Sequence, residues 1–169
     1  MTNGTKVKKR DGRIESLDLD KMHLMVEEAC EGLAGVSASQ VEMKSGIQFY
    51  DGITTQEIQD ILIRAASDLI DLDHPNYQFV AARLLLFALR KQLYGKMREL
   101  PHLEAHIMSC TNNEVYDREI FTKYSKEEID KANGFIDHDR DFLFTYAGLR
   151  QVADKYLVQD RSSGGVYET

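Results

Sequence analysis

Apolar side chains recur at spacings of three and four residues through the first part of the chain, and this pattern predicts amphipathic helices. One such helix follows Leu17, takes Asp18 or Asp20 as its N-cap, and is followed by Gly32 and Gly35. Its core-facing side is expected to carry Met22, Met25, Val26, Ala29, Cys30 and Leu33.

Three further helices are predicted before Gly95. The pattern Ser37-x-x-Gln40 is typical of a capping box and predicts a helix that ends at Asp51-Gly52. Thr54-x-x-Glu57 has the same form and predicts the next helix. His74-Pro75 interrupts the chain and starts a fourth helix that runs to Gly95.

Two short, highly charged strands are predicted ahead of these helices, at residues 7–10 and 13–17. They flank Asp11-Gly12, a pair that favours positive φ, so we expect a β-hairpin with a two-residue type I′ turn. Residues 7–95 can therefore close a core of their own, as a short β-hairpin lid and a four-helix bundle.

The hydrophobic pattern loosens after Gly95. We expect a linker at 96–101, short helices at 103–110 and 125–134, a longer helix at 140–156, and a terminal hairpin formed by 157–159 and 166–167. The predicted fold class is mainly α (α+β), with one domain at residues 1–95 and a second, incomplete one at 96–169. The second is expected to be incomplete because a two-stranded hairpin is only marginally stable on its own.

Composition agrees with a folded chain. The 169 residues are 43% hydrophobic and 29% charged, which is enough to bury a core. We find neither a long apolar run nor a charged and then apolar leader, so a cytoplasmic protein without a membrane span is expected. Cys30 and Cys110 lack the spacing of a zinc site, and Cys30 on an apolar stripe is expected to be a buried thiol.

Charge is distributed unevenly. Residues 1–13 hold five basic side chains and one acidic side chain, whereas the whole chain has a net charge of −7. A local basic cluster can attract a multiply charged anion such as a triphosphate, although most charge clusters are simply solvated. The acidic chain is not expected to bind nucleic acid, because that requires a broad basic face.

The common phosphate-binding and hydrolase motifs are absent from the sequence, so an anion site must be assembled from separate elements. We expect Lys9, Arg10, Lys21, Thr55 and Lys91 to gather around one anion, with Thr55 at a helix N-terminus. Their convergence cannot be deduced from spacing alone.

Other side chains of the same elements suit a nucleoside. Glu15 and Asp18 can accept hydrogen bonds from an adenine amino group, and Leu17, Met22 and Phe87 can pack on the base or sugar. His102-x-x-x-His106 has helical spacing, but without a third ligand we predict no metal site.

Three stretches resemble a known family. VKKRDGRIESLDLDK, QFYDGITTQEIQDILIRAASDLI and YQFVAARLLLFALRKQLYG are similar to the ATP-cone, the regulatory domain of ribonucleotide reductase large subunits. YSKEEID, FIDHDRDFLFTYAGLRQVADKYLVQDR and GGVYET resemble the stretch that joins the cone to the catalytic barrel in class I enzymes of the bacterial type. The resemblance implies binding of ATP or dATP, with Mg²⁺, as an allosteric effector of ribonucleoside-diphosphate reductase.

The resemblance also implies the partners and the effector site. The partners would be the remainder of the large subunit, the radical-bearing small (beta) subunit and further copies in a homo-oligomer. The site would comprise Val7, Lys9, Arg10, Glu15, Ser16, Leu17, Asp18, Leu19, Asp20, Lys21, Met22, Thr55, Gln59, Phe87 and Lys91. The chain departs from the family pattern at Gln59 and Ala88, where relatives carry histidine, and at Asp18, where they carry asparagine.

The family's catalytic cysteines have no counterpart in Cys30 or Cys110, so no catalytic residue is predicted and this piece alone is expected to be inactive. Two alternatives remain open. The departures at Gln59 and Ala88 allow a degenerate cone that serves subunit docking without sensing nucleotide. A transcriptional repressor can also carry a cone, but it would need a CxxC…CxxC zinc ribbon, which the sequence lacks.

Overall fold

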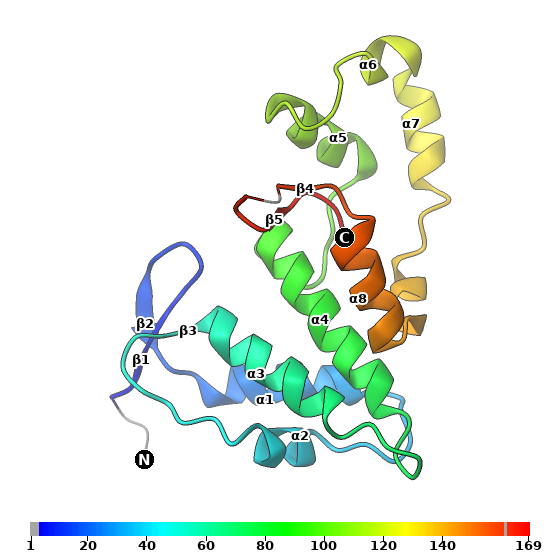
Figure 1. Ribbon diagram of the computed structural model, residues 1–169. Helices are drawn as coiled ribbons and strands as arrows, with labels where there is room; N and C mark the ends of the chain where they lie inside the picture. The colour runs from blue at the N-terminus through cyan, green and yellow to red at the C-terminus, as the bar shows by residue number, and fades with distance from the viewer. Residues whose placement is uncertain (1–3, 161) are drawn as a thin grey trace.

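The computed structural model describes residues 4–160 and 162–169 and is mainly helical, with two small sheets (Figure 1). The mainly α, α+β class predicted from the sequence is confirmed. In chain order the elements are β1 (Lys6–Lys8), β2 (Ile14–Ser16), α1 (Leu19–Cys30), α2 (Ala38–Ser45), β3 (Ile53–Thr54), α3 (Thr55–Ser67), α4 (Tyr77–Tyr94), α5 (Leu103–Asn112), α6 (Ile120–Lys123), α7 (Lys126–Asn133), the 3-10 helix η1 (His138–Leu143), α8 (Tyr146–Lys155), β4 (Gln159–Asp160) and β5 (Gly165–Val166).

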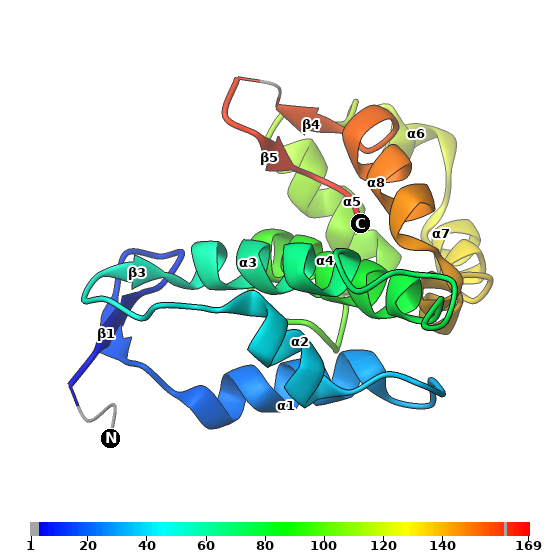
Figure 2. The same ribbon diagram turned by 60° about the horizontal axis from the view of Figure 1, so that its bottom comes forward.

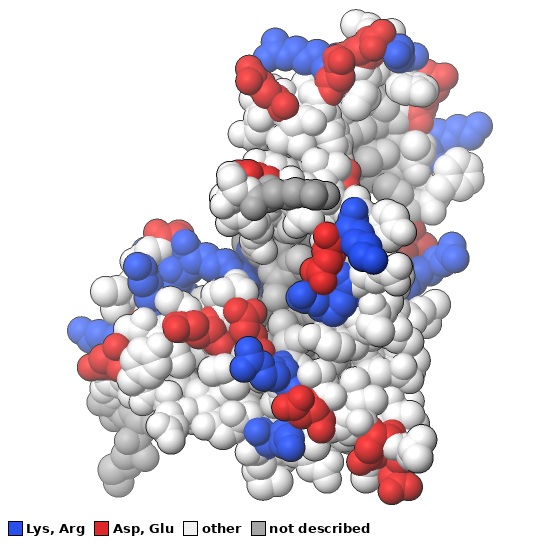
Figure 3. Space-filling model, viewed as in Figure 1, with Lys and Arg blue, Asp and Glu red and all other residues white. Residues whose placement is uncertain are grey.

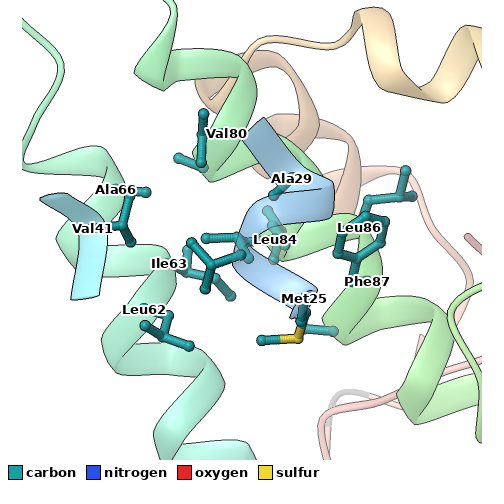
Figure 4. Close-up of a cluster of buried hydrophobic side chains, with 14 of the residues drawn as sticks. Met25, Ala29, Val41, Leu62, Ile63, Ala66, Val80, Leu84, Leu86 and Phe87 are labelled. Carbon is teal, nitrogen blue, oxygen red and sulfur yellow. The ribbon is translucent and has the colours of Figure 1, made fainter. Parts of the chain in front are cut away.

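Helices α1 to α4 enclose the hydrophobic core (Figure 4). Val26 of α1, Val41 of α2, Leu62 of α3 and Val80 of α4 are all fully shielded from solvent. Helix α4 is buried on nearly all sides, because α1 and α3 cover one side and α8 lies along another (Figure 2). A helix that is apolar around most of its circumference belongs in such a central position.

The N-terminal hairpin is confirmed, but its turn differs from the prediction. The amide of Lys9 donates to the carbonyl of Arg13 (2.8 Å), and the amide of Gly12 donates to the carbonyl of Lys9 (3.0 Å). Arg10, Asp11 and Gly12 therefore form a three-residue loop, in which the positive φ of 85° falls on Gly12 and not on Asp11. The predicted two-residue type I′ turn is wrong.

Strand β1 lies between β2 and β3. Val7 is opposite Glu15 in the antiparallel pair with β2 and opposite Ile53 in the parallel pair with β3. The sequence did not predict β3, since a strand of two residues shows no alternation. Because β3 runs directly into α3, this pairing fixes the hairpin beside the first turn of α3.

The structure confirms two of the predicted helix starts. Asp18 caps α1 by accepting from the amide of Lys21 (3.0 Å). Thr54 and Glu57 form the predicted capping box of α3.

The prediction for the second helix is wrong in two respects. Gln40 accepts a hydrogen bond from the hydroxyl of Tyr77 instead of closing a capping box on Ser37. The helix also ends at Gly46, whose φ of 53° is left-handed, well before Asp51-Gly52.

The second segment is only partly as expected. Helices α5 and α7 and the hairpin β4–β5 confirm the predictions, whereas the short helix α6 was not predicted. The predicted long helix at 140–156 is wrong, because Phe144 is extended and Thr145 starts α8 by accepting from the amide of Gly148 (3.2 Å). None of the helices in the described ranges has the length and apolar character needed to cross a bilayer.

Candidate functional site

A cavity of about 620 Å³ lies beneath the hairpin, between β1, β2, α1, the start of α3 and the end of α4. Small-molecule sites typically measure roughly 300–1,000 Å³, so the cavity can hold a nucleotide-sized ligand. Figure 3 shows Lys and Arg side chains gathered over the hairpin, at the left of the view, in a chain that is acidic overall.

Most of the residues predicted from the sequence to bind the ligand line this cavity. They are Val7, Lys9, Arg10, Glu15, Ser16, Leu17, Asp18, Lys21, Met22, Thr55, Gln59 and Lys91. Elements that are far apart in the sequence therefore do converge on one cavity.

Three of the predicted residues do not line the cavity. Leu19 and Asp20 point to other sides of α1, because the cavity-facing side carries Asp18, Lys21, Met22 and Met25 at helical spacing. Phe87 is fully buried in the core, and its ring meets the edge of Phe142 with centroids 6.1 Å apart. Phe87 is therefore enclosed in the core and does not line the cavity, and its packing on the base or sugar stays a prediction.

The structure adds lining residues that the sequence reasoning missed. These are Asp11, Arg13, Met25, Ile58, Gln92 and Gly95. Helical spacing from Met22 and Thr55 could have identified Met25 and Ile58, since residues three apart share a helix face. The same spacing from Lys91 could have identified Gly95, four residues further on, whereas Gln92 carried no such signal.

Three of the cavity's cations are paired with acids on its wall. Lys9 lies 3.3 Å from Glu15, Arg13 lies 2.7 Å from Asp11, and Lys21 lies 3.3 Å from Asp18. The hydrogen bonds from Lys21 hold the pKa of Asp18 below its usual value. Hydrogen bonds from Arg13 lower the pKa of Asp11 in the same way, so Asp11 and Asp18 stay ionised at neutral pH and offset part of the positive charge.

Arg10 is held by two amides of α3. Its Nε and Nη2 donate to Oε1 of Gln56 (3.0 and 2.5 Å), and Nη2 also donates to Oε1 of Gln59 (2.6 Å). Burial lowers the pKa of the guanidinium, which nevertheless remains charged at neutral pH because arginine starts far above it. The amides fix the position of Arg10 without cancelling its charge.

Lys91, near the end of α4, is the most isolated cation of the cavity. Its Nζ lies 3.5 Å from the thioether sulfur of Met25. Its pKa is lowered chiefly by burial and further by repulsion from Arg10 and Lys9. Within residues 4–160 and 162–169, neither Lys91 nor Arg10 has a carboxylate within 4.0 Å, so an anion entering the cavity would relieve this repulsion.

Thr55 brings a helix terminus to the cavity. It is the first residue of α3, and the adjoining Thr54 accepts from the amide of Glu57 (3.0 Å). The N-terminus of a helix carries a partial positive charge that favours anions. The hydroxyl of Thr55 and this end of α3 add uncharged donors to the cationic wall.

Two other groups of side chains, a possible metal-ligand cluster and the two cysteines, are less suited to ligand binding or catalysis than the cavity is. His102, Glu104 and Asp130 place potential metal ligands within 4.8 Å of one another, but His102 Nδ1 accepts from the amide of Glu104 and Glu104 pairs with Lys126. Cys30 and Cys110 are free thiols, and burial raises the pKa of Cys30 to about 11, so the half-buried Cys30 is protonated at neutral pH.

Fold and cavity together define a small α+β domain with a site suited to an anion. Residues 5–92 match the family model described as the ATP cone domain, and the chain therefore belongs to the ATP cone family.

Relatives extend the similarity over the whole chain. It is 47% identical over all 169 residues to the ribonucleoside-diphosphate reductase subunit alpha of Haemophilus influenzae. The identity is also 47% to the ribonucleoside-diphosphate reductase 1 subunit alpha of Escherichia coli K12, and 42% over 163 residues to the subunit alpha of Enterobacteria phage T4. The chain spans 22% of the length of the first two relatives and 21% of the third.

Proposed function

We propose that the chain binds an adenine nucleotide, ATP or dATP, beneath the hairpin and thereby regulates the overall activity of a ribonucleoside-diphosphate reductase, which makes deoxyribonucleotides. The observation that carries the proposal is the pair Arg10 and Lys91, two cations that have no carboxylate within 4.0 Å in the part of the chain that the structure describes and that are held by neutral groups on the wall of a 620 Å³ cavity. Membership of the ATP cone family and the names of the relatives support it.

In this proposal the phosphates contact Lys9, Arg10 and Lys91 and the N-terminus of α3 at Thr55. The base lies toward Glu15 and Asp18, with Leu17 and Met22 against its apolar surface; all of these residues line the cavity. Mg²⁺ would be held by phosphate oxygens and water, as is usual for this ion, because the acids of the wall are already paired with cations.

The division of the chain follows the same proposal. Residues 1–95 act as the regulatory domain, and residues 96–169 form the helical start of a catalytic domain. The partners are then the remainder of the large subunit, the radical-bearing small (beta) subunit and further copies in a homo-oligomer, all in the cytoplasm. Helix α8 and η1 pack on α4, which gives the effector domain a direct contact to the following segment.

Isothermal titration calorimetry with ATP and dATP tests the site. We expect binding near −8 kcal/mol, or about micromolar affinity, and no measurable heat from the double variant Lys9→Ala/Lys91→Ala. Lys44→Ala is the matched control, because Lys44 is exposed on α2 and does not line the cavity. Unchanged affinity in the double variant would exclude this site.

Thermal unfolding distinguishes nucleotide sensing from subunit docking without a nucleotide. At a dATP concentration of about 100 times the dissociation constant, binding should stabilise the chain by roughly 2.7 kcal/mol. A melting temperature that does not respond to ATP or dATP would favour the docking role.

A further inference from the structure

A continuous series of contacts joins the two cations without acid partners. Arg10 Nη2 donates to Gln59 Oε1 (2.6 Å), and Gln59 Nε2 donates to Met25 Sδ (3.5 Å). The same sulfur accepts from Lys91 Nζ (3.5 Å). Gln59 and Met25 therefore form a bridge between the hairpin loop and the end of α4.

Every group in this bridge is uncharged. Gln59 is 5% exposed, so its amide makes few hydrogen bonds with water. Its orientation is therefore fixed by its hydrogen bonds with Arg10 and Met25. An amide is suited to the position because it accepts on one side and donates on the other. A carboxylate there would hold Arg10 equally well but would cancel its charge.

We propose that Gln59 is a positioning residue that holds Arg10 and Lys91 in place while leaving both charges available, and that this makes the cavity select polyphosphates over monophosphates. The inference rests on the proposed function, since it assumes that the nucleotide binds in this cavity. Arg10 belongs to the hairpin loop and Lys91 to α4, so the two cations can engage different phosphate groups of one ligand. A monophosphate offers only one such group.

The substitution Gln59→Glu separates this role from a purely structural one. It preserves the shape of the side chain and its acceptor for Arg10, so a residue that merely fastens the hairpin would tolerate it or gain stability. A residue that must leave the charges of Arg10 and Lys91 available for phosphate would not tolerate this substitution. The new carboxylate would pair with Arg10 and compete with the phosphates.

The experiment is calorimetric titration of the 169-residue chain with ATP and with AMP. For Gln59→Glu we expect the affinity for ATP to fall about 30-fold, the equivalent of one charge-assisted hydrogen bond, and the affinity for AMP to fall far less. Gln48→Glu is the control, because it makes the same charge change at an exposed position outside the cavity. It should leave both affinities within about twofold, since exposed charges are screened by salt.

A second variant reaches the same bridge without adding a charge. Met25→Leu conserves side-chain volume but removes the sulfur that accepts from Gln59 and Lys91. We expect a loss of affinity for ATP of about fivefold, since only weak hydrogen bonds to a thioether sulfur are removed, with AMP little affected. Thermal melts of both variants without nucleotide establish that they are folded.

Three outcomes would overturn the inference. They are wild-type affinity for ATP in Gln59→Glu, equal losses for ATP and AMP in that variant, and equal effects of Gln59→Glu and Gln48→Glu. The proposed function survives these outcomes, because the wild-type chain would still bind ATP. Absence of binding by the wild-type chain would overturn both proposals.

Discussion

Helix α4 is in contact with two regions of the molecule, which hold it by different kinds of interaction. The first region is the rest of residues 4–95, and the second is residues 96–169 as far as the structure describes them. Toward α1, α2 and α3 the contacts are close-packed aliphatic side chains such as Val26, Val41 and Leu62. Toward η1 the ring of Phe142 lies between two arginines of α4, with centroid distances of 5.5 Å to Arg83 and 5.6 Å to Arg90.

Burial differs in the same way. The second region contributes few buried apolar residues, namely Ile107, Cys110, Ile129, Leu149 and Ala153, and it leaves Phe135, Leu143 and Tyr156 at least 70% exposed. The first region thus closes its own core, whereas the second depends on individual contacts with α4. Changes in the two regions should therefore differ in their cost to stability.

Truncation of core leucines should have the largest effect. Leu62→Ala removes a fully buried core side chain of α3 and should lower the free energy of unfolding by about 4 kcal/mol. Leu149→Ala on α8 lies at the rim of the same core and should cost about 2 kcal/mol, the lower end of the range for such changes. Urea denaturation measures both, and equal costs would contradict the contrast between the regions.

Loss of the ion pair between α4 and η1 should come next. Arg90 is 3% exposed and its Nη2 lies 2.7 Å from Asp141 Oδ2. Arg90→Ala should cost about 2 kcal/mol, below the full cost of breaking a buried pair because Asp141 is partly exposed. The exposed pair Arg150 and Asp154 on α8 is the control, and Arg150→Ala should cost only about 0.4 kcal/mol. Similar costs would mean that burial is not what makes the Arg90 pair matter.

The two capping boxes allow a sharper comparison. Thr54→Ala at α3 and Ser125→Ala at α7 should each cost about 1 kcal/mol in urea denaturation, because each removes one N-cap hydrogen bond. Only Thr54→Ala should also weaken binding of ATP in calorimetry, since only α3 begins at the cavity. Equal effects of both variants on nucleotide affinity would contradict this.

Two histidines should give the smallest effects, with opposite signs. The hydrogen bond to Glu42 raises the pKa of His23, so His23 stabilises the fold below its ordinary pKa of 6.5 and loses that effect as pH rises through the raised value. Burial lowers the pKa of His106, whose contribution is present above 6.5 and is lost as pH falls through the lowered value.

Unfolding measured between pH 5 and 8 for His23→Gln and His106→Gln checks these signs. The first variant should lose stability relative to wild type at the acid end of the range, and the second should gain relative stability there. Identical pH profiles for both variants would refute the assignment.

Local signals in the sequence predicted much of the fold. The Thr54 and Glu57 capping box and Gly95 at the end of α4 act through neighbouring backbone groups, so they can be identified without the tertiary structure. The predictions failed where a distant partner decides the outcome. The hydroxyl of Tyr77 donates to the side chain of Gln40, which therefore does not form the predicted capping box. The predicted helix at 140–156 is interrupted at Phe144, just after the ring of Phe142 packs against Phe87 of α4.

The same division applies to the cavity. Basic residues and the helix start at Thr55 could be predicted as site residues from their chemistry. The contacts that the neutral residues Gln56 and Met25 make with Arg10 and Gln59 could not be predicted, because they arise only when the hairpin loop, α1 and α3 meet. Phe87 illustrates the converse, since an aromatic residue of suitable chemistry is fully buried in the core and does not line the cavity.

The parallel pair β1–β3 has a consequence for the order of folding. Lys6 and Asp51, which are joined by a hydrogen bond of 2.9 Å, are 45 residues apart in the chain. Closing so long a loop costs entropy that is repaid only after the intervening helices have assembled. The hairpin β1–β2 and its pairing with β3 should therefore be the last part of the structure to form during refolding and the first to open. The amide protons of these strands should exchange with solvent sooner than those of α3 and α4.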